Sequence, residues 1–201
     1  FGRKRAIDQS SCNKDYSCVN GFCPSFVTVE GGTLRKPGKA EAPDFSTLPP
    51  PPPGPSLSDP YGILVTGIGG TGVVTIGALL GMAAHLEGRG VSVLDMAGLA
   101  QKNGSVVSHV RIADSPEQLH ATRIAAGEAD FVLACDILTS VNSEALAKMR
   151  KGQTKALVNT ALVMPASFTR EPDLAFPRGS MEQEIADAVG PGDAEFLDAT
   201  K

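Results

Sequence analysis

Apolar residues from position 61 onward fall into short runs separated by mixed segments, and the two kinds of segment alternate along the chain. Runs of Val, Ile and Leu that stop at glycine or polar residues are typical of buried β-strands. They predict strands over residues 62–68, 91–96, 106–113, 131–136 and 155–160. The segments between them predict helices over residues 71–87, 115–120, 142–152 and 179–189.

Local signals support this division. Ser115 is a good N-cap residue with Pro116 at the first helical position, and Gly152 closes the helix predicted to begin at residue 142. In the strand over residues 106–113, apolar positions alternate with His109 and Arg111, which indicates one polar face. The alternation of strands and helices predicts an α/β fold, a Rossmann-like three-layer sandwich around a mostly parallel sheet.

The composition changes before residue 61. Residues 37–60 contain nine of the fifteen prolines, five of them consecutive, and therefore predict an extended, semi-rigid linker. Residues 1–36 form a cysteine-bearing segment ahead of it, and residues 61–201 form the α/β domain. The chain opens without methionine, and we expect it to be part of a longer polypeptide whose sheet continues beyond residue 201.

Charge and composition narrow the class of protein. The net charge is −4, but residues 1–39 carry +4 and the remainder carries −8, so the first segment can face an anionic cofactor or an acidic partner, or simply solvent. Tryptophan is absent and other aromatic residues are few, which leaves no stacking platform for single-stranded nucleic acid. No apolar run reaches the length of a membrane span. We expect a cytoplasmic protein that binds neither nucleic acid nor membrane.

The sequence GIGGTG occupies residues 67–72, between a predicted strand and a predicted helix. In this position the sequence predicts a turn with little side-chain bulk at the start of a helix, where free N–H groups favour an anion. The residues of this turn are Gly67, Gly69, Gly70, Thr71 and Gly72. Asp95 ends the second predicted strand, where dinucleotide enzymes place an acid against the ribose. The pattern is compatible with NAD, with another anionic ligand, or with a purely structural turn.

The other chemically active side chains give no catalytic constellation. His109 in a strand and His120 in a helix are more typical of ordinary core or surface residues. Cys135 lies in a predicted buried strand and is interpreted as a small apolar residue of the core.

Three of the four cysteines, Cys12, Cys18 and Cys23, lie within twelve residues. Such crowding in a chain of cytosolic character favours metal ligands over disulfides. The spacing C-x5-C-x4-C lacks the close pairs of most zinc sites, whereas small polar neighbours and the final Cys-Pro suit an iron–sulfur cluster. The cluster is favoured, and zinc or free thiols remain alternatives. A zinc site would indicate a zinc-bearing, non-enzymatic adaptor that binds partners through its proline segment. A fourth ligand is expected upstream of Phe1.

Two segments together resemble a known family. SSCNKDYSCVNGFCPSFVTVEGG is similar to the end of the thiamine-diphosphate domain of fused indolepyruvate ferredoxin oxidoreductases. GILVTGIGGTGVVTIGALLGMAA, followed by LDMAGLAQKNGSVVSHVRIA, resembles the gamma module of the 2-oxoacid:ferredoxin oxidoreductases. The family usually has Gln in place of Thr71 and a Tyr-Gly-Pro-type loop in place of residues 97–104. Both departures fit the fused enzymes for aryl acids better than the pyruvate enzymes.

The resemblance implies oxidative decarboxylation of an aryl 2-oxo acid such as indolepyruvate, with transfer of the acyl group to coenzyme A. It implies [4Fe–4S] clusters with Cys12, Cys18 and Cys23 as ligands, thiamine diphosphate with Mg²⁺ bound mainly outside residues 1–201, and ferredoxin as electron acceptor. The family's glycine loop corresponds to Gly67, Gly69, Gly70, Thr71 and Gly72. If this loop binds an anion, the resemblance favours a phosphate of coenzyme A over NAD. The remaining domains of the longer chain and a second copy of the protein are the expected partners.

Overall fold

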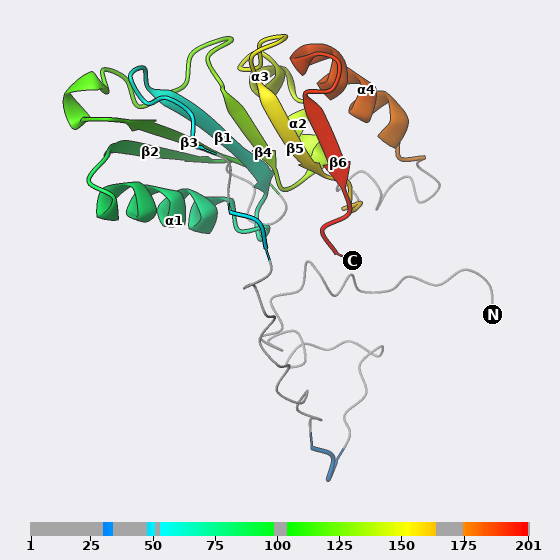
Figure 1. The fold of residues 1–201 in the computed structure, drawn as a ribbon. Helices are drawn as coiled ribbons and strands as arrows, with labels where there is room; N and C mark the ends of the chain where they lie inside the picture. Colours follow the sequence, from blue (N-terminus) through cyan, green and yellow to red (C-terminus); the bar gives the residue numbers. More distant parts are fainter. Residues whose placement is uncertain (1–29, 34–47, 51–52, 99–103, 164–174, 201) are drawn as a thin grey trace. The chain divides into compact units, whose positions relative to one another are not determined.

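The computed structural model describes residues 30–33, 48–50, 53–98, 104–163 and 175–200 (Figure 1). Its contacts divide the chain into two units, Phe1–Gly54 and Pro55–Lys201. The second unit includes residues 55–60, at the end of the predicted linker. There the Leu57 carbonyl accepts a hydrogen bond from the Asp114 amide at 3.1 Å. The domain limits given from the sequence stay predictions.

The second unit contains six strands and four helices among its described residues, with one short 3-10 turn. The strands are β1 (Tyr61–Ile68), β2 (Gly90–Ala97), β3 (Ser105–Ala113), β4 (Phe131–Ala134), β5 (Lys155–Asn159) and β6 (Ala194–Leu197). The helices are α1 (Val73–Leu86), α2 (Ile137–Ser140), α3 (Ser143–Leu146) and α4 (Arg178–Val189), and the 3-10 turn is η2 (Pro116–Gln118).

The strands form one sheet in the order β2-β3-β1-β4-β5-β6 (Figure 1). The pairs β1–β4, β4–β5 and β5–β6 are parallel, whereas β3 runs antiparallel to both β1 and β2. Five strands therefore point the same way and β3 is reversed. The predicted α/β fold with a mostly parallel sheet is confirmed.

Helices cover both faces of the sheet. Ser108 of β3 lies against Gly77 of α1, whereas Thr66 of β1 is hydrogen-bonded to Ser140 of α2 at 2.7 Å. Because Ser108 pairs with Val65, the neighbour of Thr66, these contacts lie on opposite faces of the sheet. The main apolar core lies on the face of α2 and α4, and its buried members include Leu64, Val132, Ile137, Val158, Ile185 and Val189.

Helix α1 packs on the sheet through its smallest residues. A Cβ atom at Gly77 would overlap Oγ of Ser108, and one at Gly81 would lie 2.8 Å from Cγ2 of Val93. The helix backbone can approach β2 and β3 this closely only because both positions lack a side chain. Large side chains therefore have no room on the part of the helix that faces Ser108 and Val93.

Two predictions of secondary structure need correction, and two elements were missed. The helix predicted at residues 115–120 is only the turn η2, because the Ser115 amide bonds back to Gln118 Oε1 at 2.9 Å and Leu119 is extended. The helix predicted over residues 142–152 is limited to the single turn α3, which Asn142 caps through the Ala145 amide. The elements α2 and β6 were not predicted.

None of the described helices combines the length and apolar character that crossing a membrane requires.

Candidate functional site

The GIGGTG sequence lies at the point of the sheet where the chain changes from adding strands on one side of β1 to adding them on the other. From β1 the chain passes through α1 to β2 and β3 on one side, then crosses to β4, β5 and β6 on the other. Ligands of open α/β sheets bind at such a switch point, at the carboxyl ends of the strands. Residues 67–72 include the last two residues of β1 and the turn that leads into α1, so they lie at the carboxyl end of β1, as the sequence predicts.

All four glycines of this loop have structural roles. Gly70 and Gly72 have φ values of 99° and 86°, which residues with a Cβ rarely adopt. Gly67 has no room for a side chain, because a Cβ atom there would overlap Thr71 Oγ1 and lie 2.6 Å from Val73 Cγ2. The amide of Gly69 donates to the Gly104 carbonyl at 2.8 Å, which ties the loop to the start of β3.

Thr71 stabilises the loop from within. Its hydroxyl and its amide both donate to the carbonyl of Ile68, at 2.7 Å and 3.1 Å. The side chain is therefore used to close the turn, and we assign it a structural role in this conformation.

The first turn of α1 presents uncapped amide groups. Gly72 is the N-cap, and among the described residues no side chain accepts a hydrogen bond from the helix start. The first intrahelical bond runs from the Ile76 amide to the Gly72 carbonyl at 2.9 Å. The amides of Val73, Val74 and Thr75 precede it and lack intrahelical partners, so they provide donors and a positive dipole end for an anion.

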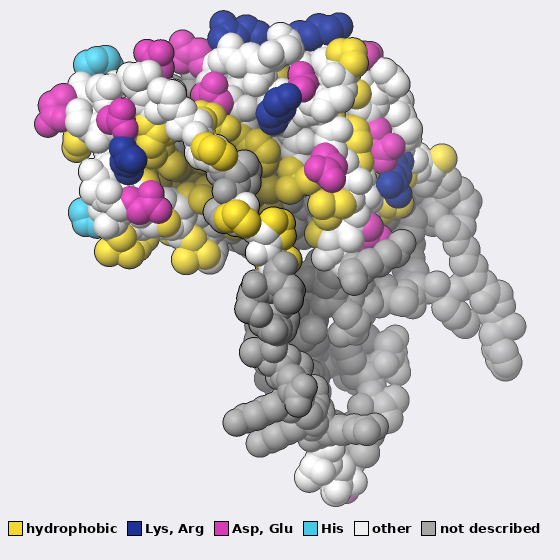
Figure 2. All heavy atoms as spheres, viewed as in Figure 1, with side chains coloured by type: hydrophobic (Ala, Val, Ile, Leu, Met, Phe, Trp, Pro, Cys, Tyr) yellow, Lys and Arg dark blue, Asp and Glu magenta, His cyan; other side chains and the backbone are white. Residues whose placement is uncertain are grey.

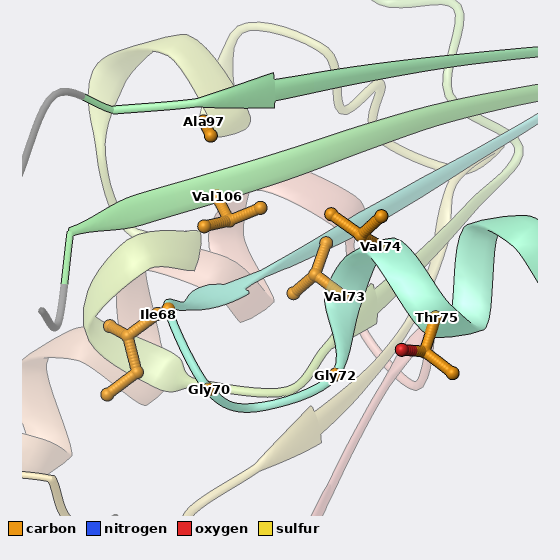
Figure 3. Close-up of a pocket in the computed structure, with 9 residues that line it drawn as sticks. Ile68, Gly70, Gly72, Val73, Val74, Thr75, Ala97 and Val106 are labelled. Carbon is orange, nitrogen blue, oxygen red and sulfur yellow. The ribbon is translucent and has the colours of Figure 1, made fainter. Parts of the chain in front are cut away.

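A pocket of about 410 Å³ opens at this helix start (Figure 3). Its walls come from the glycine loop, the first turn of α1, and the paired residues Ala97 of β2 and Val106 of β3. We call this cavity the glycine pocket. Its lining residues are Ile68, Gly69, Gly70, Gly72, Val73, Val74, Thr75, Ala97 and Val106. None of them has an ionisable side chain. The pocket is therefore suited to binding a ligand with anionic and apolar parts, and its lining offers no general acid or base.

Asp95 is separated from the glycine loop by a strand. In a dinucleotide site the acid ends the strand next to β1, but here β3 lies between β1 and β2. The carboxylate of Asp95 lies near Gly77, in the second turn of α1, rather than at the helix start. This placement does not favour the NAD interpretation.

The sequence analysis did not identify a buried polar cluster at the ends of β1 and β4. Its residues are Thr66, Asp136, Thr139 and Ser140. Asp136, 1% exposed, follows β4 and caps α2 by accepting a hydrogen bond from the Thr139 amide at 2.9 Å. Its other carboxylate oxygen has no hydrogen-bond partner among the described residues. Burial raises the pKa of Asp136, although hydrogen bonds from Thr139 partly oppose the shift. An acid directly after a buried strand was the sequence signal for this position.

Cys135 adjoins the same cluster and is a poor candidate nucleophile. Burial, and then the neighbouring Asp136, raise the pKa of the thiol, which keeps it protonated. Its Cβ lies 3.2 Å from where a Cβ of Gly67 would be, so Cys135 packs beneath the glycine loop. The interpretation as a small packing residue agrees with this position.

Neither of the two candidate histidines lines the glycine pocket. His109 is 1% exposed, and its Nδ1 accepts a hydrogen bond from the Ile124 amide at 3.2 Å. Burial lowers the pKa of His109 to about 4, with further lowering by Lys148 and Arg123 and an opposing effect of Glu144. His120 is exposed. His109 is thus a neutral core residue.

The predicted cluster ligands Cys12, Cys18 and Cys23 lie outside the described residues. Within the described ranges no group of three or more His, Cys, Asp or Glu side chains is placed to hold a metal ion. The predicted metal site therefore stays a prediction.

The fold and loop define a doubly wound α/β domain with an uncapped helix start at its switch point. The family described as pyruvate ferredoxin/flavodoxin oxidoreductase matches residues 62–193, and the chain belongs to this family. The resemblance stated from the sequence is confirmed at this level.

Curated relatives include the indolepyruvate oxidoreductase subunit IorB of two archaea. The protein from Methanothermobacter thermautotrophicus is 34% identical over 130 residues, 65% of this chain and 63% of that protein. The protein from Archaeoglobus fulgidus is 36% identical over 109 residues, 53% of this chain and 50% of that protein. The chain thus spans between half and two thirds of the length of these relatives.

Solved structures with similarity include the pyruvate oxidoreductase subunit PORC of Thermotoga maritima. It is 22% identical, with coverage of 56% of both chains and a TM-score of 0.41. The gamma subunit of a keto/oxoacid ferredoxin oxidoreductase from Geobacter sulfurreducens is 19% identical, with coverage of 69% of this chain and 60% of that chain and a TM-score of 0.39.

Proposed function

We propose that this chain is part of a cytoplasmic oxidoreductase that oxidatively decarboxylates an aryl 2-oxo acid of the indolepyruvate type. The family match over residues 62–193 carries the proposal, and the names of the curated relatives support the aryl substrate. In the overall reaction the 2-oxo acid and coenzyme A give an acyl-CoA, carbon dioxide, one proton and two electrons. Ferredoxin takes up the electrons one at a time.

The cofactors follow from the same proposal. Thiamine diphosphate with Mg²⁺, when bound to the companion domain, supplies the carbanion chemistry of the decarboxylation. Cys12, Cys18 and Cys23 would hold a [4Fe–4S] cluster for electron transfer, because thiolates are the ligands that such clusters use. The described α/β domain would contribute binding and orientation rather than proton transfer, since its pocket lining has no ionisable group.

The glycine pocket would bind a phosphate group of coenzyme A. The uncapped amides of α1 fit an anion, and the apolar walls from Val106 and Ile68 fit the less polar part of an extended ligand. The position of Asp95 supports this ligand over NAD, because β3 separates it from the loop and no other described strand next to β1 ends in an acid at the loop.

We predict that the complete enzyme, purified anaerobically, reduces ferredoxin with indolepyruvate only when coenzyme A is present. We expect kcat/KM for indolepyruvate to exceed that for pyruvate and 2-oxoglutarate, because the relatives are named for the aryl acid. The measurement is reduction of ferredoxin, followed by its absorbance, together with iron analysis. Replacing Cys12, Cys18 or Cys23 with Ala should lower the iron content and the rate.

The matched control is Cys135→Ala, which removes a thiol that packs under the glycine loop and should leave the iron content unchanged. An iron-free enzyme with full activity would contradict the proposal, as would reduction of NAD in place of ferredoxin. Zinc in place of iron would favour the zinc-bearing, non-enzymatic alternative.

A second prediction addresses the pocket. Ala97→Asp places a carboxylate in the wall of the glycine pocket, where it should repel a phosphate. At a separation of about 4 Å, like charges interact by about 1 kcal/mol in water and more in a partly buried site, so KM for coenzyme A should rise at least about fivefold. The neutral control Ala97→Asn should change KM by less than about twofold. Equal effects of the two variants would show that the anion lies elsewhere.

A further inference from the structure

The outer face of α1 has an unusual composition for a helix exposed to solvent. The large side chains of Val74, Leu79, Met82 and Leu86 are 45%, 65%, 57% and 78% exposed. Val93 of the adjacent strand β2 is 37% exposed. Figure 2 shows hydrophobic side chains protruding along this edge of the molecule. We call these five residues the α1 surface.

The cause of this exposure is the packing of α1 described above. The inner face consists of small residues, because Gly77 and Gly81 bring the helix backbone close to Ser108 and Val93. Four large apolar residues of α1 therefore point outward. Residues 73–86 contain no Asp, Glu, Lys or Arg, whereas a solvated helix face normally carries charge. Thr75 and His85 are its only polar residues, and a helix this nearly apolar is characteristic of an element buried from both sides.

The α1 surface is continuous with the glycine pocket. Val74 belongs to both, since it lines the pocket and is 45% exposed on the helix. A protein that covers α1 would therefore also reach the mouth of the pocket.

The small area of the outer face of α1 argues against a second copy of this chain paired through α1 alone. With 14 residues, α1 is about 21 Å long and, at a width of about 10 Å, offers about 200 Å². A stable interface buries about 800 Å² per partner, so the interface must extend well beyond this helix. Two copies would also bring together segments that each carry −8 over residues 40–201.

We propose that the α1 surface docks the companion subunit or domain of the same oxidoreductase, and that this companion closes the mouth of the glycine pocket. The fitting partner has a broad, charge-free apolar groove for α1, with basic side chains near Glu87 and Asp95. These two carboxylates have no ion-pair partner among the described residues. The companion's assignment to the oxidoreductase rests on the proposed function, and the names of the relatives, which describe them as subunits, agree with it.

The test uses the complete enzyme with the photo-crosslinking residue benzoylphenylalanine at position 82. The control carries it at position 183, which is exposed on α4. After irradiation, mass spectrometry should identify peptides of the companion joined to position 82 and none joined to position 183. Crosslinks from position 82 only to a second copy of this chain, or to the companion equally from both positions, would overturn the proposal.

A second measurement covers the case in which no crosslink forms. The double variant Leu79→Lys/Met82→Lys should weaken association with the companion at least tenfold, because two charges would be buried in the interface. Its melting temperature should stay close to that of the wild-type chain, since both side chains are exposed. Gln183→Lys is the matched control and should associate normally. Unchanged association of the double variant would also refute the proposal. Both readouts are independent of turnover, so a wrong substrate or electron acceptor would leave them interpretable.

Discussion

Gly67→Ala is expected to lower the free energy of unfolding by about 2 kcal/mol, within the usual range for overpacking a dense core. The added Cβ would overlap Thr71 Oγ1 and lie 2.6 Å from Val73 Cγ2 and 3.2 Å from Cys135 Cβ. Thr71 cannot move away without losing its hydrogen bond to the Ile68 carbonyl, and Val73 is 2% exposed. Urea unfolding of the full chain measures the change.

The matched control for this variant is Gly179→Ala. Gly179 lies in α4, and a Cβ atom there meets no heavy atom within 4 Å. We expect a change of less than about 0.5 kcal/mol, with a gain possible because alanine is the better helix former. If the Gly67 and Gly179 variants unfold at the same urea concentration, Gly67 does not lie against Thr71 and Val73 as the structure has it. In the complete enzyme, Gly67→Ala should also raise KM for coenzyme A, because the loop that presents the amides is displaced.

Acidification from pH 7 to pH 4.5 is expected to cost the folded chain roughly 2–3 kcal/mol through His109 alone. Its pKa is about 4 in the folded state and 6.5 in an exposed reference, so the unfolded chain takes up the proton first. The stabilising contribution is complete above pH 6.5 and is lost as the pH falls toward 4. The physical cause is burial, since protonation would place a charge at a 1% exposed site and remove the acceptor of the Ile124 amide.

His109→Gln should remove most of this dependence, because glutamine stays neutral and its carbonyl oxygen can accept the Ile124 hydrogen bond. Urea unfolding at pH 7 and at pH 4.5, compared between wild type and variant, isolates the contribution of His109. The comparison is needed because Asp136 acts in the opposite sense: its raised pKa makes the folded state less stable as the pH rises. The exposed His120→Gln is the matched control and should keep the wild-type difference. A wild-type slope in His109→Gln would refute the assignment.

The predictions that the sequence supported best were those that depend on local pattern. Runs of Val, Ile and Leu located five of the six described strands, and Gly152 marked the end of the segment before β5. The glycine loop was placed correctly between β1 and α1. Such features are local because side-chain periodicity and positive φ depend on a few consecutive residues.

The site was predicted only in part for a physical reason. A run of apolar residues indicates that a strand is buried, but not which strand lies beside it. The sequence alone therefore left Asp95 as a candidate ribose ligand, and the insertion of β3 between β1 and β2 separates it from the loop. The short connection over residues 98–104 was the available signal, because a parallel crossover needs about a dozen residues or more. Asp136 was missed for the same reason, since its setting depends on how β4 and α2 meet.

The sequence by itself determined the α/β class, the glycine loop at a helix start and the membership in an oxidoreductase family. The tertiary structure decided that β3 is reversed, that the amides of α1 open into an uncharged pocket, and that four of the large side chains of α1 face outward. Helical periodicity identifies the faces of α1 but not which of them meets the sheet. That choice follows from the space available beside Ser108 and Val93, which only glycine can occupy.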